Sequence, residues 1–288
     1  GKVNARLWRV YAGAAPKRTV LPLVNAHLTV ITSRLRHSRE AARQELCSLA
    51  SDLFQLSGEI FFDQNRYTDA AHCYTVAADT AREGKSADLW SCAMTRHSFI
   101  YVYGSQFAGA VPMLEAATGI ARRGDRSLST WQWANCVRAQ ALAGLGDLAN
   151  CERALDDAET VTALPGPARS VGWLRFDGSR LPEERGNCYT VLARPNLAAK
   201  SLEAALAGHL SPRRRGSVHV DLAATGLQCR DLDQFLSHAE TAVQLAGETG
   251  SGYITRRLKG LHPQLGKFAN DERVRDFTDK IASMEVEQ

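Results

Sequence analysis

Apolar residues recur at helical spacing along this chain, and short polar turns separate one apolar segment from the next. In residues 53–78 (LFQLSGEIFFDQNRYTDAAHCYTVAA), a first apolar segment carries Gly58 near its middle and ends at the polar turn 64–66. A second segment opens with Tyr67 and carries Ala70. Apolar residues three and four positions apart share one face of a helix. The pattern therefore predicts a helix pair that crosses closely where the small residues meet.

The pattern of the second helix occurs five times along the chain. The matching sets are Tyr67, Ala70, Tyr74 and Ala77; Phe107, Ala110, Leu114 and Ala117; Leu148, Cys151, Leu155 and Ala158; Pro195, Ala198, Leu202 and Ala205; and Leu232, Phe235, Ala239 and Ala242. The second member of each set returns after 40, 41, 47 and 37 residues. These spacings exceed the roughly 34 residues of a tetratricopeptide repeat, so longer helices or loops must contain the excess.

These repeats predict an all-α fold, a tetratricopeptide-like helical-repeat superhelix with capping helices and more than about 60% helix. Residues 1–50 would form N-terminal capping or linker helices, 51–248 about five helix pairs, and 249–288 C-terminal capping helices. Ser38 is the expected N-cap of the helix that follows it. The flanking helical segments are predicted at 3–12, 16–37, about 252–267 and about 270–284.

The longest spacing between repeats contains the most irregular stretch, LPGPARSVGWLRFDG, within a predicted insertion near 164–180. Its prolines and glycines favour turns over helix. Trp173 and Phe176 are the expected anchors of this segment. Two interpretations stay open: a loop docked on the surface, or a strap that crosses the ligand-binding groove.

Charge and cysteine content narrow the function classes. Residues 1–50 carry nine Lys and Arg against two Glu, a net +7 in a chain whose total is +4. This basic region suits proximity to nucleic acid, and it equally suits a solvated helical face. The seven cysteines are odd in number and none form a C-x-x-C pair, so we expect no disulfide framework, metal site or other cofactor.

Membrane and catalytic signatures are both weak. The longest charge-free stretch, 97–114, contains Gly104, Gly109 and Pro112, which indicate two helices and a turn and not a membrane span. The first residues lack the apolar core of a signal peptide, so a cytoplasmic location is expected. No nucleotide-binding, zinc-protease or serine-hydrolase motif is present in the sequence. We therefore predict that the chain is not an enzyme.

In a stacked helical repeat, the first helix of each pair lines the concave face. Counted from the phase of Ala70, the inward positions give an acidic end, an aromatic middle and a mixed end, which suits a peptide or an organic ligand. The aromatic residues fit a core position equally well. If they line a ligand site, the aromatic residues predict an apolar ligand, and the negative charge of Glu59 and Asp63 beside them predicts that it carries a cationic or hydrogen-donating group. The predicted ligand-binding residues are Gln55, Glu59, Asp63, Phe99, Tyr103, Trp133, Gln140 and Asn187.

The order of several short motifs resembles the C-terminal tetratricopeptide region of actinobacterial Xre/Cro-type helix-turn-helix regulators. The motifs are 7–11 (LWRVY), 20–24 (VLPLV), 46–50 (LCSLA), 56–63 (LSGEIFFD) and 173–177 (WLRFD). The resemblance covers nearly the whole chain. It implies a relationship to the regulators of Gram-positive bacteria that bind signalling peptides in a tetratricopeptide groove.

The resemblance also places a DNA-binding domain before the repeats, but residues 1–37 show no helix-turn-helix pattern. Contact with DNA would therefore require a domain outside these residues. The leading hypothesis is a ligand- or peptide-sensing regulatory domain of a bacterial transcriptional regulator. The alternative is a protein-interaction scaffold without a small-molecule ligand. A partner protein or a homodimer is compatible with both hypotheses.

Overall fold

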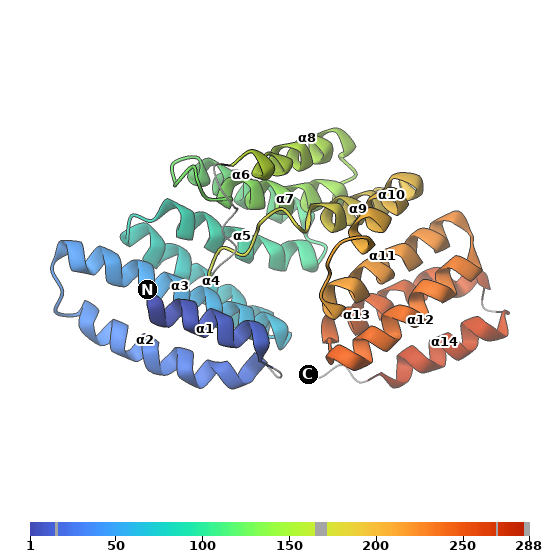
Figure 1. Cartoon of the computed structure of the whole chain (residues 1–288), viewed down its shortest axis with the longest axis horizontal. Helices are drawn as coiled ribbons and strands as arrows, with labels where there is room; N and C mark the ends of the chain where they lie inside the picture. The colour runs from blue at the N-terminus through green and yellow to red at the C-terminus, as the bar shows by residue number, and fades with distance from the viewer. Residues whose placement is uncertain (15–16, 165–171, 269, 285–288) are drawn as a thin grey trace. The chain divides into compact units, whose positions relative to one another are not determined.

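The protein is helical throughout the part of the chain described by its computed structural model, residues 1–14, 17–164, 172–268 and 270–284 (Figure 1). Helices make up 81% of these residues, and no strand occurs among them. The predicted all-α class is confirmed. No helix in the described ranges combines the length and the hydrophobicity needed to cross a bilayer.

Fourteen α-helices and three short 3-10 helices occur in the described ranges. They are α1 (Lys2–Gly13), η1 (Lys17–Val20), α2 (Leu21–Leu35), α3 (Glu40–Asp63), α4 (Tyr67–Glu83), α5 (Ala87–Tyr103), α6 (Phe107–Ala121), α7 (Thr130–Gly144), α8 (Leu148–Glu159), η2 (Thr160–Ala163), α9 (Leu181–Val191), α10 (Pro195–Leu206), α11 (Pro212–Cys229), α12 (Leu232–Thr249), α13 (Gly252–Leu261), η3 (His262–Phe268) and α14 (Glu272–Ser283).

The chain forms two compact units, Gly1–Ser179 and Arg180–Gln288. In the first unit, α3 packs on α4, α5 on α6, and α7 on α8; in the second, α9 packs on α10 and α11 on α12. The boundary between the two units, after Ser179, falls within the predicted insertion near 164–180. The division of the chain near residues 50 and 248 stays a prediction.

The second helix of each predicted pair begins where the sequence pattern places it. These helices are α4, α6, α8, α10 and α12, and they start at Tyr67, Phe107, Leu148, Pro195 and Leu232. A common turn precedes each of them, with a left-handed residue five positions before the second member of each apolar set. The left-handed residues are Asn65, Ser105, Gly146, Ala193 and Arg230, with φ between 52° and 77°.

The next amide in each turn bonds back to a carbonyl five residues earlier, which ends the preceding helix as in a Schellman motif. Arg66 N–H donates to Phe61 O at 2.9 Å, and Arg194 N–H donates to Tyr189 O at 2.8 Å. The same bond recurs at Gln106, Asp147 and Asp231. The five pairs therefore share one turn geometry despite different residue types at the left-handed position.

Small residues hold the helices of a pair close together, as the sequence predicts. A Cβ on Gly58 would lie 2.7 Å from Cδ1 of Tyr74, and a Cβ on Gly186 would lie 2.5 Å from Cγ of Leu202. Ala70 and Ala77 are fully buried. Because a Cβ at either position would displace the neighbouring side chain, the crossing distance in both units depends on glycine.

One predicted cap is wrong. Helix α3 begins at Glu40 with Arg39 at its N-cap position, and Ser38 instead donates its hydroxyl to the carbonyl of Leu35 at 3.1 Å. Ser38 thus belongs to the end of α2, because its hydroxyl reaches an orphan carbonyl there and not an amide of α3. The flanking helical segments predicted on either side of the repeats correspond to α1, η1 with α2, α13 with η3, and α14.

Candidate functional site

Helix α1 and the first helices of three pairs, α3, α5 and α7, lie side by side in the first unit. Asn4 and Trp8 of α1 both donate to the carboxylate of Asp52 on α3, at 2.8 and 2.6 Å. Further along both helices, Tyr11 donates to Asp63 at 2.6 Å. The contacts follow the same order on α1 and α3, so the two helices run in the same direction. Helix α5 packs in turn beside α3 and α7.

The polar centre of this arrangement is Arg96 on α5, whose side chain is 4% exposed. Its guanidinium donates to Gln55 Oε1 at 2.7 Å and to Glu59 Oε1 at 3.1 Å. It also lies over two indole rings, 5.5 Å from the centroid of Trp8 and 4.7 Å from that of Trp133. A buried cation needs such partners to offset its desolvation. We call these residues, with Asp52 and Ser129 at the start of α7, the first-helix face.

The acidic residues on this face already have partners. Glu59 accepts from Tyr74 OH at 3.0 Å in addition to Arg96, and Asp63 accepts from Tyr11. Burial raises the pKa of Asp52, and the hydrogen bonds from Trp8 and Asn4 oppose that shift. The carboxylates that the sequence analysis assigned to a cationic ligand thus accept hydrogen bonds from the protein's own side chains.

Residues 172–178, which we call the strap, lie against the first-helix face. Arg96 Nη2 donates to the main-chain carbonyl of Trp173 at 2.6 Å, and the Ser129 hydroxyl donates to the main-chain carbonyl of Phe176. Leu174 and Phe176 are each 2% exposed. Trp173 packs on the apolar cluster that includes Trp8. The strap is the yellow stretch that leads into α9 in Figure 1.

The strap is irregular, as predicted, and glycines with left-handed backbones bound it: Gly172 has φ 68° and Gly178 has φ 83°. The predicted anchors Trp173 and Phe176 both contact helices of the first unit. Residues 165–171 of the predicted insertion lie outside the described residues. Arg96 contacts the main chain of the segment, and the choice between a docked loop and a strap across a groove stays a prediction.

A group of half-buried aromatic rings lies at the ends of α3 and α5. Phe62 contacts Phe99 and Tyr103, with centroid separations of 5.7 and 5.5 Å, and Tyr67 contacts both Phe62 and Tyr103 at 5.3 and 5.7 Å. Of the predicted aromatic residues, Phe99 and Tyr103 share the contact with Phe62, whereas Trp133 stacks on Arg96. Phe99 and Trp133 both pack against the apolar cluster of Ala110, Leu114, Val137 and Ala141.

The remaining predicted residues lie in different parts of the molecule. Gln140 is half-buried on α7 in the first unit. Asn187 belongs to the second unit, where it donates to Asp221 at 2.9 Å. Arg96 and Ser129 were not among the residues predicted from sequence. Arg96 directly precedes the charge-free stretch 97–114, and a lone cation in an apolar helix was a signal that could have identified it.

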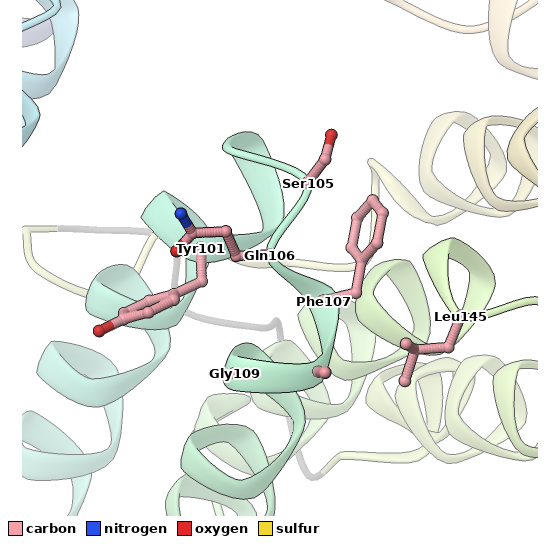
Figure 2. A pocket seen from close by; sticks show the side chains of 7 residues that line it. Tyr101, Ser105, Gln106, Phe107, Gly109 and Leu145 are labelled. Carbon is pink, nitrogen blue, oxygen red and sulfur yellow. The ribbon is translucent and has the colours of Figure 1, made fainter.

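A shallow depression lies elsewhere, at the turn between α5 and α6 (Figure 2). Phe107 and the half-exposed Leu145 lie on one side of it, and Tyr101 flanks the turn on the other. The full lining is Tyr101, Ser105, Gln106, Phe107, Ala108, Gly109 and Leu145. None of the predicted ligand-binding residues belongs to it, and it offers no charged group to orient a ligand.

The cysteines of the chain are free thiols. Six of the seven are buried, and Cys229 is exposed. Within the described ranges, no group of three or more His, Cys, Asp and Glu side chains is arranged to hold a metal ion.

Comparison of the chain with models of known protein families and with curated proteins finds no match.

Proposed function

We propose that this chain is a tetratricopeptide-like sensor domain of a bacterial transcriptional regulator, and that its first-helix face binds a peptide. Five helix pairs with one turn geometry and a fixed apolar pattern support the tetratricopeptide-like assignment. The motif order that resembles Xre/Cro-type regulators supports the regulatory role. The domain would act by binding its ligand better in one conformation than in another.

One observation carries the choice of a peptide as ligand. The first-helix face already holds a stretch of polypeptide through its main chain, because Arg96 and Ser129 each donate to a carbonyl of the strap. Donors aimed at carbonyls recognise a peptide backbone, and the apolar contacts beside them select side chains. A peptide ligand would use the same two kinds of contact.

The chemistry of the face also changes the ligand expected from sequence. Glu59 and Asp63 accept hydrogen bonds from Arg96, Tyr74 and Tyr11, so a cationic ligand would compete with the protein's own donors for these carboxylates. A donor that lost its acceptor in this competition would cost about 1–3 kcal/mol if it stayed buried. A ligand that brings carbonyl acceptors and apolar side chains avoids this cost.

The proposal is tested by a thermal-shift screen with a library of random heptapeptides and, separately, a metabolite library. A peptide at 100 times its dissociation constant should stabilise the domain by about 2.7 kcal/mol. Tyr103→Ala should reduce that shift, because Tyr103 belongs to the aromatic group beside the face. Leu145→Ala, at a half-exposed residue of the depression, is the matched control and should leave the shift unchanged.

The screen also separates the sensor from the scaffold. Stabilisation by a short peptide or by a metabolite that depends on Tyr103 supports a sensor, and a metabolite alone would reject the peptide assignment. Stabilisation only by a folded partner protein supports the scaffold. A shift that persists unchanged in Tyr103→Ala would place the ligand elsewhere and contradict the assignment to this face.

A further inference from the structure

We propose that the strap is a built-in competitor, which occupies the peptide site of the first-helix face and must leave before an external peptide binds. The external ligand is then an extended peptide that reproduces the apolar pattern of the strap. This inference rests on the proposed function, since it concerns the regulation and the ligand of the same site.

The two donors that hold the strap are fixed before any peptide arrives. Arg96 is 4% exposed and constrained by Gln55, Glu59 and two tryptophans. Ser129 is fully buried at the N-cap of α7, where its hydroxyl makes no cap bond and points to Phe176 O instead. The two side chains thus form a preorganised pair that donates to carbonyls three residues apart, a span of at most about 10 Å in an extended chain.

The side chains of the strap define which peptides fit. Leu174 and Phe176 are buried, whereas Arg175 and Asp177 between and after them are exposed. Alternation of buried and exposed residues is the pattern of an extended chain, whose successive side chains point to opposite sides. The ligand class is therefore an extended peptide with large apolar residues two positions apart and a polar residue between them.

The strap is attached in a way that allows exchange. It forms no helix, and Gly172 and Gly178 at its ends adopt left-handed conformations that glycine enters and leaves at low cost. A peptide of the same pattern replaces each contact that the strap gives up. The exchange then depends on the affinity of the peptide against the effective concentration of the tethered strap, which is in the millimolar range for a short tether.

Displacement would have a defined consequence for the chain. The strap ends one residue before Ser179, the last residue of the first unit, and α9 of the second unit follows directly. A peptide that replaces the strap therefore releases the segment that leads into α9.

The first test uses the strap itself as the probe, a fluorescent heptapeptide GWLRFDG with the sequence of residues 172–178. The variant Leu174→Ser/Phe176→Ser weakens the resident strap and should bind this peptide at least ~10-fold more tightly than the wild type, because more of the sites are free. The control Arg175→Ser/Asp177→Ser changes exposed residues of the same strap and should bind as weakly as the wild type. A folded Leu174→Ser/Phe176→Ser variant that binds no better than the control overturns the proposal.

A second test needs no variant of the protein and decides the matter if the double variant fails to fold. Trypsin cleaves after Arg175, which is exposed in the strap. An unlabelled peptide GWLQFDG, which trypsin cannot cut, should speed cleavage at this bond several-fold in the wild-type protein, and a scrambled peptide should not. Unchanged cleavage at saturating peptide overturns the proposal.

The two proposals fail in different ways. Suppose that the weakened strap variant binds the strap peptide but no library peptide stabilises the wild type. This result supports competition by the strap and contradicts the sensor function. Binding of a library peptide at the face through Tyr103 with unchanged cleavage at Arg175 supports the sensor function and contradicts competition by the strap.

Discussion

The two units hold their neighbouring first helices together with different chemistry. In the first unit, Arg96 is enclosed by two tryptophans and one of its donors reaches the main chain of the strap. In the second unit, Glu183 pairs with Arg214 and Asp221 pairs with Arg257 across the same kind of helix interface. In the second unit these ion pairs join one helix to another. In the first unit, one hydrogen bond of the buried Arg96 goes to a segment outside the helices.

A ligand can replace a contact most easily where that contact does not join two helices. Arg257 satisfies its donors on Asp221 and Ser217, which belong to the adjacent helix α11. Displacing such contacts would separate the helices themselves. The contact of Arg96 with Trp173 can be exchanged without moving a helix, because the acceptor is an ordinary main-chain carbonyl that any peptide carries.

The largest expected effect is that of removing Arg96. Arg96→Ala breaks a buried polar network and should lower the free energy of unfolding by about 3 kcal/mol. The counterpart Arg257→Ala should cost about 2 kcal/mol, since Asp221 keeps the hydrogen bond from Asn187. Urea denaturation gives both values. The sharper contrast is tryptic cleavage after Arg175, which should speed up only in Arg96→Ala; equal acceleration in both variants would remove the distinction between the units.

Adding one methyl group at equivalent helix crossings should give the next largest effect. Gly58→Ala drives a Cβ into the rigid ring of Tyr74 and should cost about 2 kcal/mol. Gly186→Ala meets the side chain of Leu202, which can change rotamer, and the better helix propensity of alanine offsets part of the cost. The second change should therefore cost less than about 1 kcal/mol. Equal denaturation midpoints for the two variants would show that the tyrosine is no more rigid than the leucine.

The left-handed turns allow a reciprocal exchange between the units. Gly146 in the first unit has φ 77° with open space around it, and Ala193 in the second has φ 52° at the equivalent turn position. Gly146→Ala should destabilise by about 1 kcal/mol, and Ala193→Gly should stabilise by a similar or smaller amount. Thermal melting of both variants tests the shared turn. Changes of the same sign would indicate that the two turns differ.

The smallest expected effect concerns pH in the second unit. His219 and His238 approach with their Nδ1 atoms 3.1 Å apart, and burial, His238 and Arg215 lower the pKa of His219 to about 4. Burial also lowers the pKa of His238, although Glu203 opposes that shift. Below about pH 6.5 the unfolded chain then binds protons that the folded His219 excludes until about pH 4, so stability falls across this window.

Both histidines are only half-buried, so solvent screening limits the effect to about 1 kcal/mol or less. His219→Gln should flatten this part of the stability curve between pH 7 and pH 4, as measured by urea midpoints. Asp52 in the first unit contributes to the pH dependence of stability with the opposite sign. Its raised pKa lets the folded state bind a proton more readily than the unfolded state as pH falls. A variant His219→Gln with an unchanged pH dependence would show that the histidine pair does not contribute.

The sequence predicted the starts of the five second helices because the small and large apolar residues fix the helical phase. It did not predict the turns at Ser105 and Ala193, since neither residue type favours a left-handed backbone and the packing of the pair imposes it. Ser38 was misplaced as a cap because a local pattern cannot tell which of two helix ends a serine hydroxyl will reach.

The candidate site was less accessible to sequence reasoning than the fold. Gln55 and Glu59 were found from their position on a first helix, but their shared partner Arg96 is 41 and 37 residues away. The contact between Arg96 and the strap spans 77 residues. No periodicity connects such positions, so the strap could be named from its composition but not assigned to a donor.

One nuclear magnetic resonance signal reports whether Arg96 holds a main-chain carbonyl of the strap. The dipeptide Trp-Leu occurs once in the sequence, at 173–174. Protein labelled with ¹³C-carbonyl tryptophan and ¹⁵N-leucine therefore gives a single correlation through the carbonyl that accepts from Arg96. We expect Arg96→Gln and saturating GWLQFDG peptide both to move this carbonyl resonance upfield toward its free-peptide position, because a hydrogen bond is lost. A resonance already at the free-peptide position in the wild type, or unmoved in Arg96→Gln, would contradict this expectation.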